Sequence, residues 1–346
     1  MKAAYFEQFG HKITIENLPD PAPNADEAIV QVKATGLCRS DWHGWMGHDS
    51  DIQLPHVPGH ELAGVIVAVG KGVKHWQVGD RVTVPFCLGC GHCQQCHSGN
   101  QQICDRYEQP GFTYWGSFAE LVKIKYADQN LVRLPEAMDF ATAAVLGCRF
   151  ITSYRGVVAQ GKVEAEQWVA IHGCGGVGLS AIMIAVAMGA QVIAIDIDTE
   201  KLAFAKKIGA TLTLNARQQK NIPEAIQELT SGGAHLSIDA LGSKITCYNS
   251  ILGLRKRGRH IQIGLLSGSE ARPEIPMETV ISKELEILGS HGMQAHQYTP
   301  MLDLIHSGKL QPHLMIGRQI SLQEGINELM EMHAFKQVGV SVIGSF

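Results

Sequence analysis

The sequence lacks a long hydrophobic run. Its richest apolar stretch, residues 179–189, is far shorter than the ~18 residues that a membrane-spanning helix requires, so we predict a buried helix there and no membrane partner. The first ten residues contain no apolar segment of the kind found in secretory signal peptides. Because nothing indicates secretion, the nine cysteines favour metal binding or catalysis over a disulfide framework. We expect a cytoplasmic location.

The sequence also lacks blocks of like charge, internal repeats and low-complexity segments. A formal net charge of −4 argues against a nucleic-acid partner, which would call for a basic surface. Five residues, Arg255–Arg259, form a local basic cluster. We interpret this cluster as a solvated loop or turn, with a phosphate-contacting rim as the alternative. The 346 residues, 45% of them apolar, suffice for about two domains with sizeable cores.

Short β-type runs fill the N-terminal region. They are separated by glycines and by the proline-rich residues 19–24, which fit neither a helix nor a central strand. The pattern predicts a turn-rich small barrel. Its expected strands cover residues 13–15, 28–32, 61–69 and 80–84.

The pattern changes near residue 168, where β-type runs begin to alternate with helical segments. This alternation is typical of βαβ units and predicts an α/β domain with a parallel sheet. The expected strands cover residues 168–172, 191–195, 236–239 and 259–264, and the expected helices cover residues 179–189 and 201–207.

Four cysteines follow the spacing C-x2-C-x2-C-x7-C: Cys90, Cys93, Cys96 and Cys104. Thiolates at this spacing can surround one tetrahedral Zn²⁺ ion, and the intervening chain has too little apolar content to fold without it. A site closed by four protein ligands is structural rather than catalytic. Cys87 could compete as a ligand, but the register that begins at Cys90 spaces the sulfurs more evenly. Free thiols and an iron–sulfur cluster are the alternatives.

A second, dispersed set of metal-binding residue types consists of Cys38, His60, Glu61 and Cys148. Two thiolates and an imidazole leave a fourth position for water or substrate, as in an open catalytic zinc site. Spacing alone does not establish this site, because the residues lie far apart in sequence. A lone cysteine near a histidine is more often structural than catalytic.

A glycine-rich loop follows the expected strand 168–172 and matches G-x-G-x-x-G. In this context it predicts a dinucleotide site, because backbone N–H groups can approach a pyrophosphate at the start of the following helix. Asp196 ends the next β run, 18 residues after Gly178, where an acid can bind the adenosine ribose and repel a 2′-phosphate. We therefore expect NAD rather than NADP. The loop reads Gly173, Cys174, Gly175, Gly176, Val177 and Gly178.

Taken together, these motifs resemble those of the zinc-dependent alcohol dehydrogenases of the medium-chain dehydrogenase/reductase (MDR) family, over essentially the whole chain. The residues that carry the resemblance are Gly59-His60-Glu61 with Gly64 and Gly70, the four-cysteine segment, Gly147-Cys148 and the nucleotide loop. It implies an α/β chain with two domains. A GroES-like β-barrel catalytic domain would comprise residues 1–148 and 291–346, with a structural-zinc lobe at 87–104. An inserted Rossmann domain, a doubly wound parallel sheet, would span residues 149–290.

The resemblance also implies roles for individual residues. Two Zn²⁺ ions are expected, one structural and one catalytic. Cys38, His60 and Cys148 match the catalytic zinc ligands, and Glu61 matches a carboxylate that can transiently join them. Asp41 matches the acid that orients His60, while Ser40 and His43 match a proton relay. The expected coenzyme contacts are Arg39, Thr152, the loop residues, Asp196, Lys201, Leu241, Ile263 and Leu265.

The implied activity is hydride transfer between a primary, secondary or aromatic alcohol and NAD, giving an aldehyde or ketone. The alcohol would ionise on zinc, and its proton would leave through Ser40 and His43. Polyol dehydrogenases are the nearest alternative, but they typically replace the second thiolate with a carboxylate, and Cys148 argues against them. A non-catalytic protein that binds zinc and NAD is the other alternative. Three tryptophans, Trp42, Trp45 and Trp115, could line the substrate site or serve in packing.

The sequence departs from the family pattern in one respect. Relatives often carry a coenzyme-contacting arginine near the C-terminus, whereas residues 338–342 contain none and the last arginine is Arg318. Weaker NAD binding or a substitute cation would follow. The connection between Cys104 and Gly116 is short, as in the microbial enzymes, which are usually tetrameric. A homo-oligomer, with a tetramer favoured over a dimer, is therefore expected.

Overall fold

The chain leaves its first folded unit, builds a second, and then returns to the first. The computed structural model describes residues 1–334 and 338–346. Unit 1 comprises Met1–Ile151, Gly292–Leu302 and Ile316–Phe346. Unit 2 comprises Thr152–His291 and Asp303–Met315. The first crossing lies three residues beyond the predicted boundary, and the predicted returning segment contains a part, Asp303–Met315, that packs with unit 2.

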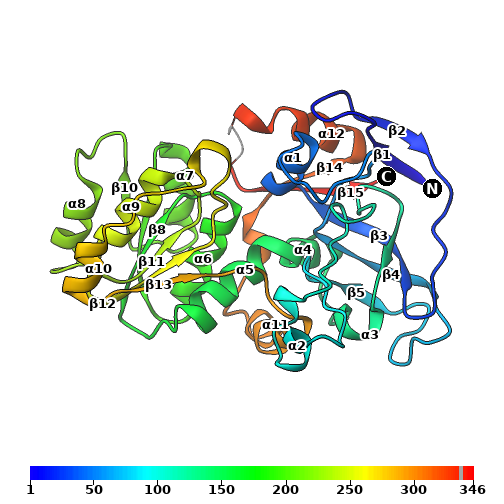
Figure 1. The fold of residues 1–346 in the computed structure, drawn as a ribbon, viewed down its shortest axis with the longest axis horizontal. Coiled ribbons are helices and arrows are strands. Elements are labelled where there is room, and N and C mark those ends of the chain that lie inside the picture. Colours follow the sequence, from blue (N-terminus) through cyan, green and yellow to red (C-terminus); the bar gives the residue numbers. More distant parts are fainter. Residues whose placement is uncertain (335–337) are drawn as a thin grey trace. The chain divides into compact units, whose positions relative to one another are not determined.

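Unit 1 is built on a seven-stranded, mainly antiparallel sheet with the order β14-β15-β3-β4-β5-β7, in which β6 also pairs with β3. A separate two-stranded sheet joins β1 to β2. Figure 1 shows these strands with α1, α4 and α12 around them. The strands are β1 Lys2–Tyr5, β2 Thr14–Asn17, β3 Ala28–Gly36, β4 Leu62–Val69, β5 Arg81–Thr83, β6 Leu121–Ile124, β7 Val132–Arg133, β14 Ile316–Ser321 and β15 Val340–Ser345.

The helices of unit 1 are short and lie between these strands. They are α1 Arg39–Trp45, α2 Gln94–His97, α3 Ala127–Asn130, α4 Phe140–Ala144 and α12 Leu322–Met330, with the 3₁₀ turns η1 Gln101–Ile103, η5 Ala295–Gln297 and η7 Met332–Ala334 and the π-helical turn η2 Leu146–Phe150. Helix α5 Ile151–Tyr154 begins at the last residue of this part of unit 1, and α11 Tyr298–His306 runs from unit 1 into unit 2.

Strand β3 shows why these residues form a sheet. Its middle alternates Val30 and Val32, which are buried, with Gln31 and Lys33, which are exposed, as expected for a strand with one face on the core. The buried side chains join a cluster with residues of β4, β5 and β6. Antiparallel pairing brings Thr35, at the end of β3, opposite Leu62, at the start of β4. The residues that follow β3 and those that precede β4 therefore lie together.

Unit 2 contains a six-stranded sheet with the order β10-β9-β8-β11-β12-β13. All its pairings are parallel, so this is the strand order of a Rossmann fold, with the switch point between β8 and β11. The strands are β8 Trp168–His172, β9 Gln191–Asp196, β10 Leu212–Asn215, β11 Ala234–Asp239, β12 Leu254–Gln262 and β13 Glu286–Gly289.

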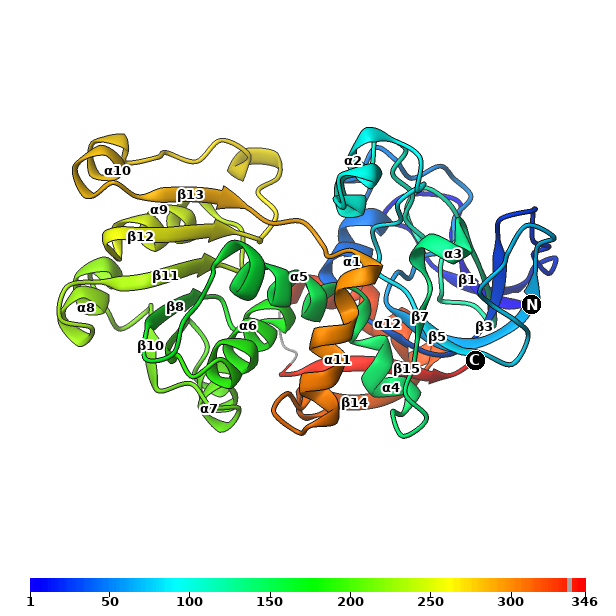
Figure 2. The same ribbon diagram turned by 90° about the horizontal axis from the view of Figure 1, so that it is seen from below.

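Helices flank both faces of this sheet (Figures 1 and 2). One face packs on α8, α9 and α10 through a buried cluster that includes Ile193, Ile226 and Ile251. The helices and turns of unit 2 are η3 Arg155–Gln160 (a π-helical turn), α6 Gly176–Ala187, α7 Thr199–Lys207, α8 Ile222–Leu229, α9 Lys244–Leu252, η4 Gly268–Glu270, α10 Met277–Lys283 and η6 Pro312–Met315.

One secondary-structure prediction is wrong. The basic cluster Arg255–Arg259 does not form a loop but lies within β12. The pairing of β11 with β12 shifts register between Ala234 and Leu236, and Arg257 has a positive φ of 60°. At this irregularity the three consecutive residues Arg255, Lys256 and Arg257 are all exposed. Residues 254–258 are mostly charged and show no alternation of apolar and polar side chains, so the sequence pattern did not indicate a strand there.

No helix in residues 1–334 or 338–346 combines the length and the apolar character needed to cross a membrane.

Candidate active site and metal centres

Unit 1 brings together four residues that are distant in sequence. Cys38 precedes α1, His60 and Glu61 precede β4, and Cys148 lies in the π-helical turn η2. One potential ligand atom from each lies within 4.8 Å of all the others. The close approach depends on Gly36, because a Cβ atom there would lie 2.3 Å from Glu61 Oε2. The four predicted residues of the dispersed set therefore share one site.

Asp41 orients the imidazole of His60. The Asp41 Oδ1 atom lies 2.7 Å from His60 Nδ1, and both side chains are fully buried. The same carboxylate accepts hydrogen bonds from the backbone N–H groups of Gly59 (3.2 Å) and Cys38 (3.0 Å). A carboxylate at Nδ1 keeps the proton on that nitrogen and leaves Nε2 as the bare electron pair.

The Nε2 atom of His60 is buried and meets no partner at hydrogen-bonding geometry among the described residues. A buried polar atom without a partner is costly, and a metal ion beside the two sulfurs would satisfy it. Although burial opposes protonation, the negative charge of Asp41 holds the pKa of His60 well above its usual value. A basic imidazole is a good zinc ligand, and a metal ion bound at Nε2 would take the place of the proton that this raised pKa favours. The residues present fit a catalytic zinc ion.

The two thiols of the site share a hydrogen bond. This bond to Cys148 is the main reason that the pKa of Cys38 lies well below its usual value, and the nearby His60 lowers it further. The same bond, together with burial, raises the pKa of Cys148. One thiolate is therefore already favoured, and zinc binding would require loss of the second proton.

Sequence reasoning missed Arg149. Its side chain is buried and holds the Glu61 carboxylate with both ends of the guanidinium, Nη2 to Oε2 at 2.6 Å and Nε to Oε1 at 2.9 Å. Nη2 also donates to the Leu37 carbonyl. Burial raises the pKa of Glu61 to about 7 while Arg149 opposes the rise. The ion pair with Arg149 holds the Glu61 carboxylate beside the metal-binding atoms. A signal was present in the sequence, since Arg149 directly follows the predicted ligand Cys148.

The four cysteines of the predicted structural lobe also meet. Cys90, Cys93, Cys96 and Cys104 place their sulfurs within 4.8 Å of one another. Backbone N–H groups point at three of these sulfurs, for example Arg106 N–H at Cys104 (3.2 Å). Such a donor, from Cys96 N–H, is the main cause that lowers the pKa of Cys93 to about 7. Burial instead raises the pKa of Cys96 to about 12 and also raises the pKa of Cys104, so zinc binding would require these thiols to lose their protons. The four grouped sulfurs fit a zinc ion.

Cys87 stays outside this group. It is 1% exposed and its Sγ donates to the carbonyl of Met293 (3.5 Å), which agrees with the register that begins at Cys90. His92 and His97 are exposed. None of the nine cysteines, all within the described part of the chain, forms a disulfide.

The predicted relay residues lie on α1. Ser40 Oγ is 3.8 Å from Cys38 Sγ, so the hydroxyl borders the metal-binding atoms. His43 lies one turn further along the helix and its Nδ1 is 3.0 Å from Nδ1 of His48. Burial, followed by the charge of Arg39, lowers the pKa of His43 to about 4. The imidazole is neutral at pH 7 and can accept a proton.

Arg39 was predicted to contact the coenzyme pyrophosphate. Its Nη1 donates to the carbonyl of Met332 (2.7 Å), and its guanidinium stacks 4.2 Å from the Trp42 ring centroid. These contacts lie within unit 1. Trp45 is 7% exposed and donates to the His11 carbonyl (2.7 Å), so it serves in packing.

The glycine-rich loop lies in unit 2 between β8 and α6. Gly173 has φ +96°, and a Cβ atom at Gly178 would meet the Gly173 carbonyl oxygen at 1.8 Å, so both positions require glycine. A Cβ at Gly175 would meet no atom within 4 Å, which leaves open space above the start of α6. Gly176 and Val177 form the first turn of that helix. The loop fits a coenzyme pyrophosphate.

Asp196 closes this loop. Its Oδ2 accepts a hydrogen bond from Cys174 N–H (2.7 Å), and its Oδ1 accepts bonds from Ile197 N–H (2.7 Å) and Asp198 N–H (3.0 Å). The carboxylate is therefore held rigidly at the carboxyl end of β9. Of the other predicted coenzyme residues in unit 2, Thr152 is buried, Lys201 lies on α7, Ile263 packs beside Gly156, and Leu241 and Leu265 are 52% and 63% exposed.

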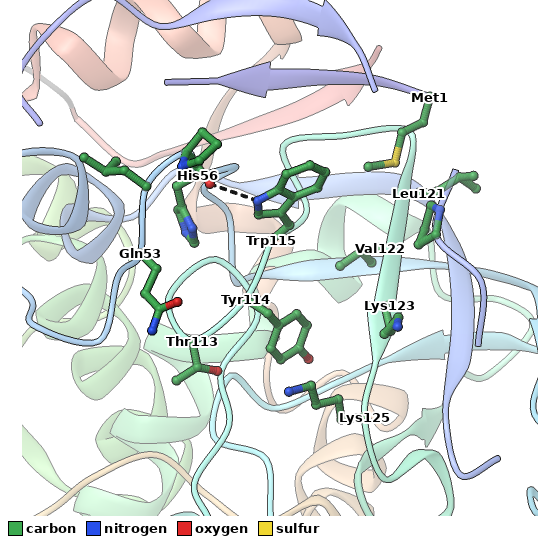
Figure 3. A pocket seen from close by; sticks show the side chains of 13 residues that line it. Met1, Gln53, His56, Thr113, Tyr114, Trp115, Leu121, Val122, Lys123 and Lys125 are labelled. Carbon is green, nitrogen blue, oxygen red and sulfur yellow. Dashed lines mark hydrogen bonds between the residues drawn. The ribbon is translucent and has the colours of Figure 1, made fainter. Parts of the chain in front are cut away.

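Unit 1 also contains a cavity of about 420 Å³ beside β6. Its walls include the loops 53–56 and 113–115 (Figure 3). Two lysines in the wall are paired with carboxylates, Lys123 with Glu27 (3.1 Å) and Lys125 with Glu108 (2.7 Å). Trp115 lines this cavity and donates to the Pro55 carbonyl (3.1 Å). None of the predicted catalytic, coenzyme-binding or metal-binding residues contributes to its walls.

Comparison with known proteins agrees with this geometry. The sequence model described as "Alcohol dehydrogenase GroES-like domain" matches residues 24–136, and that described as "Zinc-binding dehydrogenase" matches residues 176–307. An alcohol dehydrogenase of Geobacillus stearothermophilus is 33% identical over 346 residues, which cover 99% of each chain. The chain belongs to the zinc-dependent alcohol dehydrogenases of the MDR family. A Moraxella sp. alcohol dehydrogenase is 36% identical over 90% of each chain.

Solved structures of this zinc-dependent alcohol dehydrogenase family share the fold over the full chain. The benzyl alcohol dehydrogenase of Acinetobacter calcoaceticus has a TM-score of 0.92 at 26% identity, covering 100% of this chain and 99% of its own. A Thermus sp. alcohol dehydrogenase has a TM-score of 0.91 at 29% identity, with 100% of both chains covered. The predicted family and the predicted GroES-like plus Rossmann architecture are confirmed. The chain is thus a nicotinamide-dependent oxidoreductase of the alcohol dehydrogenase type.

Proposed function

We propose that this enzyme transfers hydride between an alcohol and NAD, giving an aldehyde or ketone, at the site formed by Cys38, His60 and Cys148. The observation that carries the proposal is the bare, buried Nε2 atom of His60, oriented by Asp41 toward two thiols. When bound there, zinc would supply Lewis acidity, which lowers the pKa of an alcohol. A second zinc ion would be held by Cys90, Cys93, Cys96 and Cys104 and would stabilise the lobe.

The chain's own residues would orient the groups and carry the proton. Asp41 keeps His60 in one tautomer, and Arg149 keeps Glu61 beside the site. The Ser40 hydroxyl, which borders Cys38, would receive the alcohol proton, and neutral His43 would take it onward. In unit 2, the Gly173–Gly178 loop would bind the pyrophosphate and Asp196 the adenosine ribose.

NAD is proposed over NADP because the Asp196 carboxylate would face a 2′-phosphate with like charge. Solved relatives include both an NADH complex and an NADP complex, so the family does not decide the coenzyme. Thr152, Lys201, Leu241, Ile263 and Leu265 are proposed as further coenzyme contacts, and Arg39 is proposed as a pyrophosphate contact.

Primary and secondary alcohols, aromatic ones included, are the proposed substrates. The full-length structural likeness to a benzyl alcohol dehydrogenase supports aromatic alcohols. Rates of NADH formation and NADP reduction across ethanol, 2-propanol and benzyl alcohol would rank them. A homotetramer in a reducing, cytoplasmic compartment is proposed from the short connection after Cys104 and from nine cysteines without a disulfide. Light scattering on the purified enzyme tests the tetramer.

The metal assignment is tested by Cys38→Ser, with Cys87→Ser as the matched control because Cys87 lies outside both sulfur groups. We expect Cys38→Ser to lose one of two zinc equivalents and all detectable NADH formation. Cys87→Ser should keep both zinc equivalents and its activity. Two zinc equivalents and normal turnover in Cys38→Ser would contradict the assignment.

A further inference from the structure

The end of helix α1 places a second histidine against the predicted relay histidine. Gly47, at φ +75°, follows the last turn and donates to the Gly44 carbonyl (3.0 Å), while His48 N–H donates to the His43 carbonyl (3.0 Å). This pair of bonds is a Schellman motif, which glycine permits because it adopts positive φ without strain. The motif turns the chain back so that His48 lies beside His43.

The imidazoles of His43 and His48 approach each other through their Nδ1 atoms. Nδ1 of His43 lies 3.0 Å from Nδ1 of His48, so one of these nitrogens carries a proton and the other accepts it. When His43 donates, its Nε2 is the bare nitrogen and can accept a proton from another group. Trp42 packs edgewise against both rings, with centroid distances of 5.0 Å and 5.7 Å. The ring contacts hold the two imidazoles in place.

The two histidines differ in their surroundings. His43 is half-buried and faces the charge of Arg39, which disfavours a second proton on its ring. His48 is exposed to solvent. A proton that reaches His43 is therefore poorly held there, and His48 offers the direct route to water.

Other titratable groups lie on the elements around this pair. Arg39 and Cys38 act on His43 from the start of α1. Elements α12 and η7 pack against α1, and the N-terminal loop contacts it through the bond from Trp45 to His11. Two of the carboxylates on these segments are hydrogen-bonded elsewhere, Glu324 to Ser321 and Glu328 to Ser341. The titratable groups on these segments are Glu7, His11, Lys12, Glu324, Glu328 and His333, and Asp49 and Asp51 follow His48 in the chain.

We propose that the proton relay continues from His43 to His48. His43 would accept a proton at Nε2 and at the same time pass the proton on its Nδ1 to Nδ1 of His48, and His48 would release a proton to water. Each imidazole gains one proton and loses one, and aldehyde reduction would run the same transfers in reverse. This inference rests on the relay of the proposed function and extends it by one residue.

The test compares His48→Gln and His43→Gln with His75→Gln, since His75 is an exposed histidine elsewhere in unit 1. The readouts are kcat for alcohol oxidation against pH, the solvent deuterium isotope effect, and rescue by free imidazole. We expect His48→Gln to lower kcat by about tenfold at acidic pH, less than the ~10²–10⁴-fold effect of losing a direct proton acceptor. Imidazole should restore the rate, because His48 is exposed and a small base can replace it.

The outcomes separate this inference from the relay itself. If His43→Gln is slow while His48→Gln behaves as His75→Gln and ignores imidazole, the relay ends at His43 and the inference is wrong. If His43→Gln is also normal, the relay fails and the inference fails with it. The double variant should be no slower than His43→Gln alone, and additive losses would count against a shared path. Equal melting temperatures exclude a folding defect, and rescue by imidazole is not expected of a merely structural residue.

Discussion

Replacing Arg149 with methionine isolates the buried ion pair beside the catalytic centre. Methionine keeps much of the side-chain volume but leaves the Glu61 carboxylate, which is 0% exposed, without its cation. Removing one partner of a buried pair costs ~3–5 kcal/mol. Burial already raises the pKa of Glu61 to about 7, so protonation of the carboxyl limits the loss at neutral pH and the lower end of this range applies. We expect a loss of about 3 kcal/mol at pH 7.

The sign of the pH dependence follows from the same carboxyl. Without Arg149 the pKa of Glu61 in the folded protein rises further above 4.5, so the folded state binds a proton that the unfolded state releases. The stability of Arg149→Met then falls as pH rises from about 5 to 8. The deficit relative to the wild-type protein should shrink at pH 5.

Urea unfolding followed by tryptophan fluorescence suits this measurement, because all tryptophans except Trp168 lie in unit 1. With a slope of ~2–3 kcal/mol per M, the expected loss lowers the midpoint by about 1 M. Arg133→Met is the control: Arg133 pairs with Asp80 at 2.6 Å but is 57% exposed, so it should cost under ~1 kcal/mol. Adding Glu61→Gln to Arg149→Met should recover stability. A deficit for Arg149→Met no larger than that of the control would refute the reasoning.

Three further predictions concern other sites. Burial lowers the pKa of His172 to about 3, so the unfolded chain takes up a proton at a higher pH than the folded chain, and stability falls as pH drops from about 6.5 toward 3. His172→Gln should flatten this part of the profile of melting temperature against pH. An unchanged slope would contradict this role of His172. Cys93→Ser should release one zinc equivalent and speed amide hydrogen exchange in residues 90–104, while the Cys38 site keeps its metal; slow exchange would show that the lobe folds without zinc. Asp196→Asn should raise KM for NAD by about 10–100-fold, since charge-assisted hydrogen bonds contribute ~1.5–3 kcal/mol, and should raise KM for NADP less; an equal rise for both coenzymes would remove the charge argument.

Sequence reasoning predicted best those sites whose residues lie close together in the chain. The cysteine lobe and the glycine loop are local, so spacing and context sufficed for both. The cluster of Cys38, His60 and Cys148 needed the family resemblance, because strand pairing between β3 and β4 brings it together and no spacing rule encodes that.

What the sequence concealed was the protein partners of several charged side chains. Arg39 is predicted to contact the coenzyme, and the structure shows that it also contacts Met332 and Trp42. Arg149 was overlooked, although its guanidinium forms a buried ion pair with Glu61. Long cationic side chains reach several neighbours, so their partners depend on packing rather than on sequence position. The prediction of a loop for the basic cluster Arg255–Arg259, which lies in β12, was wrong because exposed strand residues need not alternate between apolar and polar types.

The pairing of β15 with β3 sets an order for the assembly of the catalytic centre. Val342 and Ile343 lie opposite Gly36 and Thr35, two and three residues before Cys38. During synthesis the segment that carries Cys38 emerges before unit 2, while the strand beside it, β15, emerges only after the last segment of unit 2. Domains tend to fold as units when their sequence is available. The β8–β13 sheet can therefore form while β3 still lacks β15 as its neighbour, and the catalytic centre would gain its final shape only after β15 has been synthesised.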